Sequence, residues 1–336
     1  MDTVAHIRKS DATEGVAFPV LNRAYERVFQ PGKLTVGLVI PLENYARSAA
    51  PTMAQHLERA QLAERLGFGA LWLRDVPFNV PSFGDAGQLF DPFTYLGALA
   101  MQTSEIALGV ASIVLTLRHP AHVAKAAHSV DQLSGGRVLL GIASGDRPEE
   151  FPALGFSYDD RGQRFRDAYT YLRQAAESHP RMDGPFGRSD GAIDLLPKPV
   201  AGRLPLLITG SSQQAPQWLA EHGDGWMTYP RAEAQQATLI DDYRSRGRDA
   251  GVAARPVMEP LYIDLMDDPD AAPTPIHLGL RLGVRQLRRY LDARRHIGVN
   301  HVALNLRFNQ GDIPATLQTL AEELLPHFAA QEQPHA

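Results

Sequence analysis

The sequence predicts an α/β protein of the (β/α)8, or TIM-barrel, class, with an N-terminal extension and an insertion between the fourth helix and the fifth strand. Short runs rich in Val, Leu and Ile alternate eight times with longer segments of helical periodicity. Eight strand–helix units are the number that closes a parallel sheet into a barrel. The runs are almost continuously apolar, as expected of strands that are covered on both faces.

The strands are predicted from these apolar runs, and the helices from periodic segments that end at glycine, proline or polar residues. Gly67 ends the first helix and Gly135 the third, because glycine readily adopts the left-handed conformation that stops a helix. The predicted strands are residues 34–40, 70–73, 106–114, 138–142, 206–209, 225–228, 257–265 and 301–306. The predicted helices, in the same order, are residues 53–66, 92–101, 121–133, 163–177, 216–222, 232–246, 285–296 and 314–328.

Three segments fall outside this pattern. Residues 1–33 form the predicted extension, with a helix around residues 21–29 that would cover the N-terminal end of a barrel spanning residues 34–330. Residues 179–204, rich in Pro, Gly and charged side chains, form the predicted insertion. Residues 267–280 leave the seventh strand and are a lid candidate. Long excursions from a compact domain tend to be functional or mobile.

The main structural alternative is an open, doubly wound sheet. Such a sheet usually carries a phosphate-binding loop directly after its first strand, whereas Ile40 is followed by Pro-Leu-Glu-Asn. The chain contains neither a G-x-G-x-x-G nor a Walker A pattern. The barrel is therefore favoured.

Composition narrows the function. The chain has 336 residues, of which 44% are hydrophobic and 21% charged, with a net charge of -5 and no cysteine. The lack of cysteine excludes disulfides, Cys-ligated zinc, thiolate-bound iron–sulfur clusters and a cysteine nucleophile. The mild acidity argues against nucleic-acid binding, and no apolar run is long enough to span a bilayer. Because the N-terminus also has no signal-peptide pattern, we expect a soluble, cytoplasmic protein.

In a TIM barrel the reactive residues follow the C-terminal ends of the strands. Residues 209–216 are the most informative, because a glycine and two serines separate the fifth strand from a helix whose N-terminus attracts anions. Ser211 and Gln214 fit a capping box, although Pro216 favours a helix that starts one or two residues later. An ordinary capped helix explains the segment equally well.

Two other strand ends are rich in small residues. Residues 141–148 follow the fourth strand, and an arginine on the next helix is suited to clamp a phosphate. A glycine turn beside a solvated arginine face explains that charge pattern more simply. Residues 109–114 place small side chains in the middle of the third strand. They indicate either close packing between strands or a wall for a planar ligand.

Three histidines of one helical segment, His119, His122 and His128, are candidate metal ligands. His119 and His122 share a helix face, but metal-dependent barrels usually take ligands from several strand ends, and the chain has no His-x-His. We therefore expect no metal site. A catalytic role for His119, at the barrel mouth, is more plausible than metal binding, but the sequence indicates no partner for it. The arginine-rich segment 281–295 is interpreted as a solvated helix face.

Four motifs, in this order, resemble those of the bacterial-luciferase-like flavin monooxygenases. They are GFGALWL at residues 67–73, LRHP at 117–120, DQLSGGR at 131–137 and GDGW at 223–226. The resemblance runs over about residues 33–327. It implies the barrel fold with an insertion after the fourth helix. It also implies FMN as the cofactor, or the deazaflavin coenzyme in one branch of the family.

The resemblance implies roles for single residues. Ala111-Ser112 corresponds to the non-prolyl cis peptide that the family places under the flavin ring, and Arg164 corresponds to its phosphate-clamping arginine. Ser144 stands where the luciferases have an arginine, so Arg147 is the nearest replacement for that phosphate contact. The cofactor-binding residues implied in this way are Ala111, Ser112, Ser144, Gly145, Arg147, Arg164, Gly210, Ser211, Ser212 and Gln213.

Many members of the family carry one or two histidines at the end of the second strand, whereas this chain has Arg74-Asp75-Val76-Pro77-Phe78 there. The family's catalytic residues therefore do not transfer, and the catalytic residues stay unassigned. We expect Asp75, Phe78 and His119 to line the substrate pocket.

The leading hypothesis is an FMN-dependent luciferase-like monooxygenase that uses reduced flavin and dioxygen to oxygenate a small organic substrate. Because the chain lacks a nicotinamide-binding fingerprint, a separate NAD(P)H-dependent flavin reductase is the expected partner, and a homodimer is the expected assembly. The alternatives are a non-catalytic flavin-binding protein and a deazaflavin-dependent oxidoreductase of the same fold. A Schiff-base lyase is disfavoured, because none of the four lysines follows a predicted strand.

Overall fold

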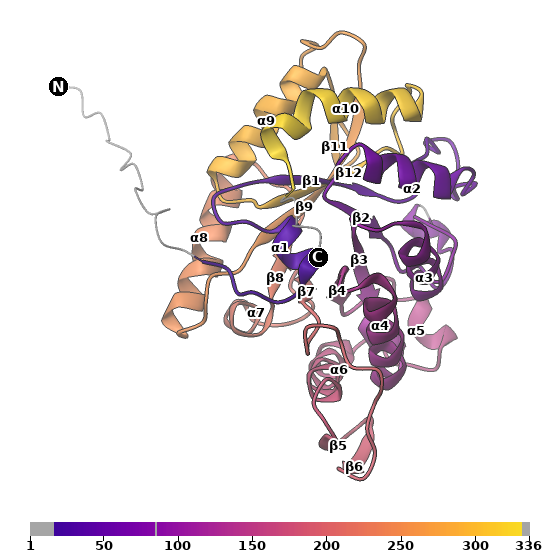
Figure 1. Ribbon diagram of the computed structural model, residues 1–336, viewed down its shortest axis with the longest axis vertical. Coiled ribbons are helices and arrows are strands. Elements are labelled where there is room, and N and C mark those ends of the chain that lie inside the picture. The colour runs from indigo at the N-terminus through magenta and orange to yellow at the C-terminus, as the bar shows by residue number, and fades with distance from the viewer. Residues whose placement is uncertain (1–16, 85, 331–336) are drawn as a thin grey trace, which may run out of the picture.

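The computed structural model describes residues 17–84 and 86–330, which form a closed parallel barrel (Figure 1). Each barrel strand pairs in parallel with the next one along the chain, and the last pairs with the first, which closes the ring. The barrel strands of the described residues are β1 (Thr35–Val39), β2 (Ala70–Leu73), β3 (Ala107–Val114), β4 (Val138–Ala143), β7 (Leu206–Thr209), β8 (Gly225–Met227), β9 (Val257–Leu265) and β12 (His301–Asn305). The predicted TIM-barrel class is confirmed.

Each strand is followed by the helix that the sequence predicts, and the helices surround the strands in Figure 1. Local sequence explains where they begin. Asp91 precedes Pro92 at the start of α3, and its carboxylate accepts hydrogen bonds from two N–H groups of the first turn. No helix in the described ranges is both long and apolar enough to span a bilayer. The helices are α2 (His56–Arg65), α3 (Pro92–Gln102), α4 (Pro120–Ser134), α6 (Arg161–Ala175), α7 (Pro216–His222), α8 (Glu233–Asp249), α9 (Val284–His296) and α10 (Ile313–Phe328).

The helix expected near residues 21–29 is α1 (Arg23–Val28), which covers the N-terminal end of the barrel. Asn22 Nδ2 donates to Val138 O, the first residue of β4, at 2.8 Å. The Tyr25 hydroxyl donates to Asp224 O, just before β8, at 2.7 Å. Figure 1 shows α1 in the middle of the ring of strands. Because α1 covers this end, a ligand can enter the barrel only from the opposite, C-terminal end.

The barrel interior contains a buried chain of polar groups. Trp72 Nε1 donates to His301 Nε2 at 2.8 Å, and His301 Nδ1 lies 2.7 Å from the Thr35 hydroxyl, which in turn donates to Val28 O. Burial lowers the pKa of His301 to about 3, so the ring is neutral at pH 7. A Cβ at Gly109 would lie 2.2 Å from the Trp72 ring. Close packing is therefore the reason for the small residue at this position.

The insertion is tied to α4. It begins with an antiparallel hairpin, β5 (Arg181–Gly184) and β6 (Gly187–Asp190), which projects beside α6 at the bottom of Figure 1. The chain then returns along α4, where His128 Nδ1 lies 3.1 Å from Pro197 O and Gln132 Nε2 donates to Lys198 O at 2.8 Å. Side chains of α4 therefore hold the insertion in place.

The lid candidate 267–280 contributes to the barrel sheet. β10 (Thr274–Ile276) pairs antiparallel with β11 (Gly279–Leu282), and β11 pairs in parallel with the C-terminal half of β9. β11 thereby lies on the β8 side of β9 and extends the barrel wall beyond the end of β8. Three further elements are too short to show periodicity in the sequence: α5 (Glu150–Ala153), η1 (Pro81–Phe83) and η2 (Leu115–Leu117).

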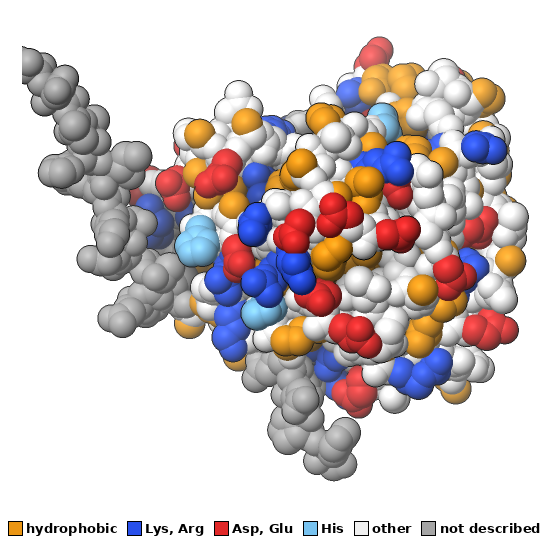
Figure 2. Space-filling view, turned by 90° about the horizontal axis from the view of Figure 1, so that it is seen from above, with side chains coloured by type: hydrophobic (Ala, Val, Ile, Leu, Met, Phe, Trp, Pro, Cys, Tyr) orange, Lys and Arg blue, Asp and Glu red, His pale blue; other side chains and the backbone are white. Residues whose placement is uncertain are grey.

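Acidic and basic side chains are interspersed over the face shown in Figure 2. In α9, Arg285 pairs with Asp270 at 2.6 Å on the surface, as expected of a solvated helix face. Arg294, in contrast, is buried and pairs with Glu259 of β9, with an Nη2–Oε1 distance of 2.5 Å. The interpretation of segment 281–295 as a solvated face is therefore wrong for Arg294.

Candidate functional site

A cavity opens at the C-terminal end of the barrel, where this class of fold places its active sites. It encloses about 90 Å³, and most of its lining side chains are apolar or carry a hydroxyl group. Such a wall suits a flat, largely apolar ligand. The barrel strands contribute Val39, Ala111, Thr209, Met227, Met258 and Ala303 to it.

One wall of the cavity is the irregular end of β3. The Ala111–Ser112 peptide bond is cis, as the family resemblance implies. Ala111 lines the cavity, and the Ser112 hydroxyl contacts the hydroxyl of Thr209 at the end of β7. The two interpretations of residues 109–114 thus apply to different positions, because Gly109 serves packing and Ala111 forms the cavity wall.

The loop after β7 has an uncommon backbone. Ser212 and Gln213 have φ values of 44° and 61°, in the left-handed region that non-glycine residues seldom occupy. The Ser212 hydroxyl holds the turn by donating to Thr209 O at 2.8 Å. The backbone N–H groups of Ser211 and Ser212 donate to no acceptor in the part of the chain that the structure describes. Adjacent N–H groups beside two hydroxyls suit an oxyanion.

The capping box expected of Ser211 and Gln214 is wrong. α7 begins at Pro216, because the fixed φ of proline suits the first position of a helix. The residue before it, Ala215, is the N-cap, and no side chain forms a capping hydrogen bond there. Gln214 Nε2 donates instead to Gly162 O, in the first turn of α6, at 2.8 Å. The loop is therefore docked on α6.

Arg164 lies in the same first turn of α6 and is held from several sides. Its Nε donates to Thr116 O at 2.7 Å, and its Cζ lies 4.0 Å from the centre of the Phe156 ring and 4.9 Å from that of Phe186. Among the described residues, no carboxylate forms an ion pair with it. Burial lowers the pKa of Arg164, but an arginine stays charged at neutral pH. A fixed guanidinium of this kind suits a phosphate.

Hydrogen bonds connect Arg164 to a second strand end. The Thr116 hydroxyl donates to Ser144 O, directly after β4, at 2.9 Å. Gly145 follows with a φ of 83°. The structure thus brings together the ends of β3, β4 and β7 and the start of α6, which carry Ser112, Ser144, Gly145, Arg164 and the loop 210–213.

Arg147 lies in another part of the mouth. Its Cζ is 4.3 Å from the centre of the Phe83 ring, and its Nη1 is 3.6 Å from Glu150 Oε1. Burial raises the pKa of Glu150, although the charge of Arg147 opposes that shift. None of these contacts joins Arg147 to Arg164, so its role in phosphate binding stays a prediction.

The three residues expected in the substrate pocket do not line the cavity. The buried Asp75 carboxylate accepts hydrogen bonds from Arg118 Nη2 at 2.7 Å and from the N–H of Val114 at 3.0 Å, which ties β2 to β3. His119 accepts at Nδ1 from the first turn of α4 and contacts the insertion, while Phe78 is exposed. Their place in a substrate pocket stays a prediction.

Sequence reasoning did not select Arg74, the first residue after β2. In the structure Arg74 lines the cavity, as does Tyr262 near the end of β9. The position of Arg74 directly after β2 was the only signal in the sequence that could have indicated a place in the site.

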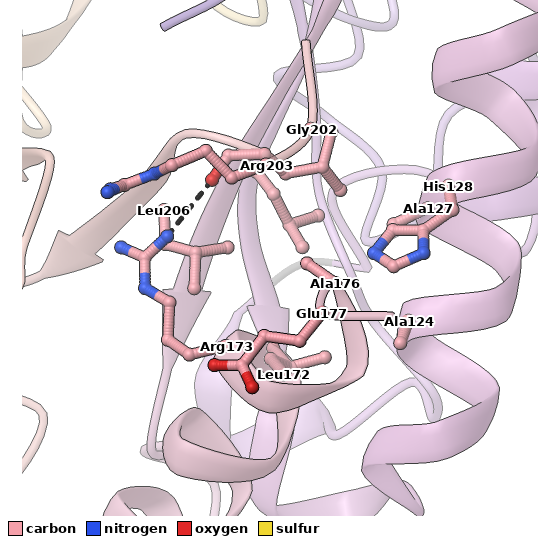
Figure 3. Close-up of a pocket in the computed structure, with 12 residues that line it drawn as sticks. Ala124, Ala127, His128, Leu172, Arg173, Ala176, Glu177, Gly202, Arg203 and Leu206 are labelled. Atoms are coloured by element: carbon pink, nitrogen blue, oxygen red, sulfur yellow. Dashed lines mark hydrogen bonds between the residues drawn. The ribbon is translucent and has the colours of Figure 1, made fainter. Parts of the chain in front are cut away.

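A second cavity, of about 340 Å³, lies outside the barrel between α4 and α6 (Figure 3). Ala124, Ala127 and Leu172 line it, and Arg173 Nη1 donates across its edge to the carbonyl of Leu204 at 3.1 Å. It lies beside the start of β7, at the end of the barrel away from the mouth. No group of three or more acidic or histidine side chains in the described ranges is arranged to hold a metal.

Residues 34–322 match the sequence profile of the family described as luciferase-like monooxygenase. The chain belongs to this family. Its members are flavin- or F420-dependent monooxygenases and other oxidoreductases, and this luciferase-like protein is an enzyme of that kind.

One curated relative and two solved structures illustrate the range of the family. This luciferase-like protein is 28% identical over 226 residues to the F420-dependent hydroxymycolic acid dehydrogenase of Mycobacterium tuberculosis, covering 66% of this chain and 60% of that protein. It resembles the monooxygenase RslO1 from Streptomyces bottropensis with a TM-score of 0.73 and 21% identity, over 88% of this chain and 100% of the other. It also resembles the oxygenating constituent of 3,6-diketocamphane monooxygenase from Pseudomonas putida, in complex with FMN, with a TM-score of 0.71 and 15% identity, over 89% and 100% of the two chains. At these identities the structural matches show the shared fold.

Proposed function

We propose that this protein is an FMN-dependent monooxygenase, which uses reduced flavin and dioxygen to oxygenate a small organic substrate. The observation that carries the proposal is Arg164. Its guanidinium lies over two phenylalanine rings and forms no ion pair with a carboxylate of the described chain. Its helix contacts a loop with two N–H groups that lack acceptors among the described residues. These are the features that bind a terminal phosphate, which FMN carries.

The residues present fit FMN. Arg164 and the loop 210–213 would hold the phosphate, and the ring would lie in the mouth cavity against Ala111. Met227 and Met258 would exclude water from that cavity. When bound, reduced FMN supplies the electrons that activate dioxygen, and the protein contributes orientation and a dry pocket.

A deazaflavin-dependent oxidoreductase is the second candidate. The relative from Mycobacterium tuberculosis supports it, because its name specifies F420. A phosphate-bearing deazaflavin would use the same arginine and loop. A non-catalytic flavin-binding protein would bind FMN without consuming dioxygen. On the FMN hypothesis we further propose a cytoplasmic homodimer that receives reduced flavin from a separate NAD(P)H-dependent reductase.

Titration of apoprotein with FMN, riboflavin and F420 tests the site. Riboflavin lacks the phosphate, so its affinity should be insensitive to Arg164→Ala. FMN affinity should fall about 10- to 150-fold in that variant, since a hydrogen bond to a charged group contributes about 1.5–3 kcal/mol. Arg166→Ala, an exposed arginine on the same helix, is the matched control and should bind FMN as the wild type does. Unchanged FMN binding by Arg164→Ala would place the phosphate elsewhere, and tighter binding of F420 than of FMN would favour the second candidate.

Oxygen chemistry is tested by mixing the complex of protein and reduced FMN with dioxygen in a stopped-flow instrument. A monooxygenase should return the flavin to its oxidised absorbance more slowly than free FMN does. A time course identical to that of free FMN contradicts oxygenation and supports a binding protein.

A further inference from the structure

Arg74 distinguishes the mouth cavity of this chain. Among the described residues that line the cavity, it is the only one with a charged side chain. The other lining residues are apolar or carry hydroxyl or amide groups, and Tyr262 is one of them. A guanidinium in such a wall recognises carboxylates and sulfonates, because its N–H groups match two oxygens at once.

The loop outside the cavity fixes where Arg74 lies. A Cβ at Gly87 would lie 2.6 Å from Arg74 Cζ, so the guanidinium lies directly against this backbone. Gly87 O accepts a hydrogen bond from the Tyr45 hydroxyl at 3.1 Å, and Gln88 Nε2 donates to Arg74 O at 2.7 Å. The arginine is thus held from the loop side, and it also lines the cavity.

Arg307, after β12, brings a second guanidinium to the same side of the mouth. Its Cζ lies 4.9 Å from the centre of the Tyr45 ring. Burial lowers the pKa of Arg307, and the nearby charge of Arg74 lowers it as well. Burial raises the pKa of Tyr262, whereas the charge of Arg74 opposes that shift. An anion bound beside Arg74 would be stabilised by both positive charges.

Arg307 lies across the ring from the proposed phosphate site, and Arg74 lies on the wall between the two. In the closed ring of strands, β12 stands opposite β4, and β1 stands opposite β7. Arg164 and the loop 210–213 lie by the ends of β4 and β7, while Arg74 and Arg307 follow β2 and β12. A cofactor anchored by its phosphate on one side leaves the arginine side to the substrate.

We propose that the substrate is an organic acid, in which an apolar or aromatic body carries a carboxylate or sulfonate, and that Arg74 binds this acidic group with the Tyr262 hydroxyl beside it. The inference rests on the proposed function and names the substrate class of the same site. Arg74 is in this sense the residue that determines specificity.

Calorimetric titration with three probes that share one aromatic body tests the proposal. They are phenylacetate, phenylmethanesulfonate and the uncharged phenylacetamide, added to apoprotein and to FMN-loaded protein. At least one acid should bind about tenfold or more tightly than the amide, the lower range for a hydrogen bond to a charged group. The tighter of the two acids identifies the head group. Arg74→Gln should remove the preference for acids and leave the amide affinity unchanged, an effect that loss of a merely structural arginine would not produce.

Arg285→Gln, which removes an exposed arginine paired with Asp270, is the control and should keep the preference. FMN titration of each variant reports whether it is folded, and Tyr262→Phe provides a second test, with an expected loss of several-fold in acid affinity alone. Equal binding of acids and amide by the wild type, or a preference that persists in Arg74→Gln, overturns the proposal. If the wild type binds no FMN, the proposed function fails, while the acid preference of the apoprotein still decides this inference.

Discussion

The guanidinium carbon of Arg164 lies 4.9 Å from the centre of the Phe186 ring, at the turn of the β5–β6 hairpin. His119 Nε2 lies 3.0 Å from the carbonyl of Phe186, and the Tyr171 ring packs near the same phenylalanine. The hairpin turn is therefore fixed against α4 and α6. An insertion that contributes no barrel strand thus reaches the proposed phosphate site and helps to orient its arginine.

Replacing Phe186 by alanine should weaken FMN binding about two- to fivefold, because a cation–π contact at a half-exposed site contributes about 0.5–1 kcal/mol. Riboflavin affinity should not change, since only the phosphate contacts depend on Arg164. Fluorescence titration with both ligands measures the ratio. Ile193→Ala, an exposed position in the same insertion, should behave as the wild type. Equal weakening of FMN and riboflavin would show that the hairpin acts on something other than the phosphate contacts.

The fold could be predicted because its signals are local. β2 spans the residues predicted from its apolar run, and α7 likewise begins and ends where proline and glycine indicate. The capping box failed for a non-local reason. Gln214 finds its partner at Gly162, a residue 52 positions away on another helix, and no spacing rule gives that contact.

The candidate site could be predicted only where the family resemblance supplied the register. Arg164 was selected in that way, among several arginines of similar local pattern. Its stacking on Phe186 depends on how the insertion folds back, which the sequence does not reveal. Arg74 follows a strand like many other residues, and its importance becomes visible only when Gly87 and Tyr262 lie beside it.

Gly109→Ala should destabilise the protein by at least about 1–3 kcal/mol, the usual range for overpacking a core. The new methyl group would lie 2.2 Å from the Trp72 ring, which cannot move without losing its hydrogen bond to His301. Gly97→Ala in α3 is the control, because that position faces open space and alanine favours helix by up to about 1 kcal/mol. Urea denaturation measures both. Similar stability of the two variants would contradict the packing role assigned to Gly109.

Asp224→Asn should destabilise the fold by about 2–4 kcal/mol. The carboxylate is buried and pairs with Arg173 Nη2 at 2.6 Å and with Arg203, and it accepts from the Leu206 N–H at 2.9 Å. Burial alone would raise the pKa of Asp224, but the two guanidinium groups hold it below its usual value. Removing one partner of a fully buried ion pair costs about 3–5 kcal/mol. The loss expected here is smaller, because Arg203 is half exposed.

Thermal or urea unfolding compares this variant with Asp242→Asn, which breaks a surface pair with Arg246. The surface pair should contribute about 0.5 kcal/mol or less. A loss at Asp224 as small as that at Asp242 would mean that the buried cluster does not stabilise the junction between β7 and β8.

His128→Gln should flatten the dependence of stability on pH below neutrality. Burial lowers the pKa of His128 to about 4, against 6.5 for the unperturbed side chain. Between these values the unfolded chain binds a proton that the folded chain does not, so the free energy of unfolding falls as the pH is lowered through this window, by up to about 1.4 kcal/mol per unit. Glutamine can still donate to Pro197 O but does not titrate. Urea unfolding at a series of pH values from neutral to about pH 4.5 measures the slope. The control is His122→Gln, at an exposed position on the same helix, which should keep the wild-type slope. If the free energy of unfolding of His128→Gln depends on pH as that of the wild type does, the assignment of a neutral, buried histidine beneath the insertion is contradicted.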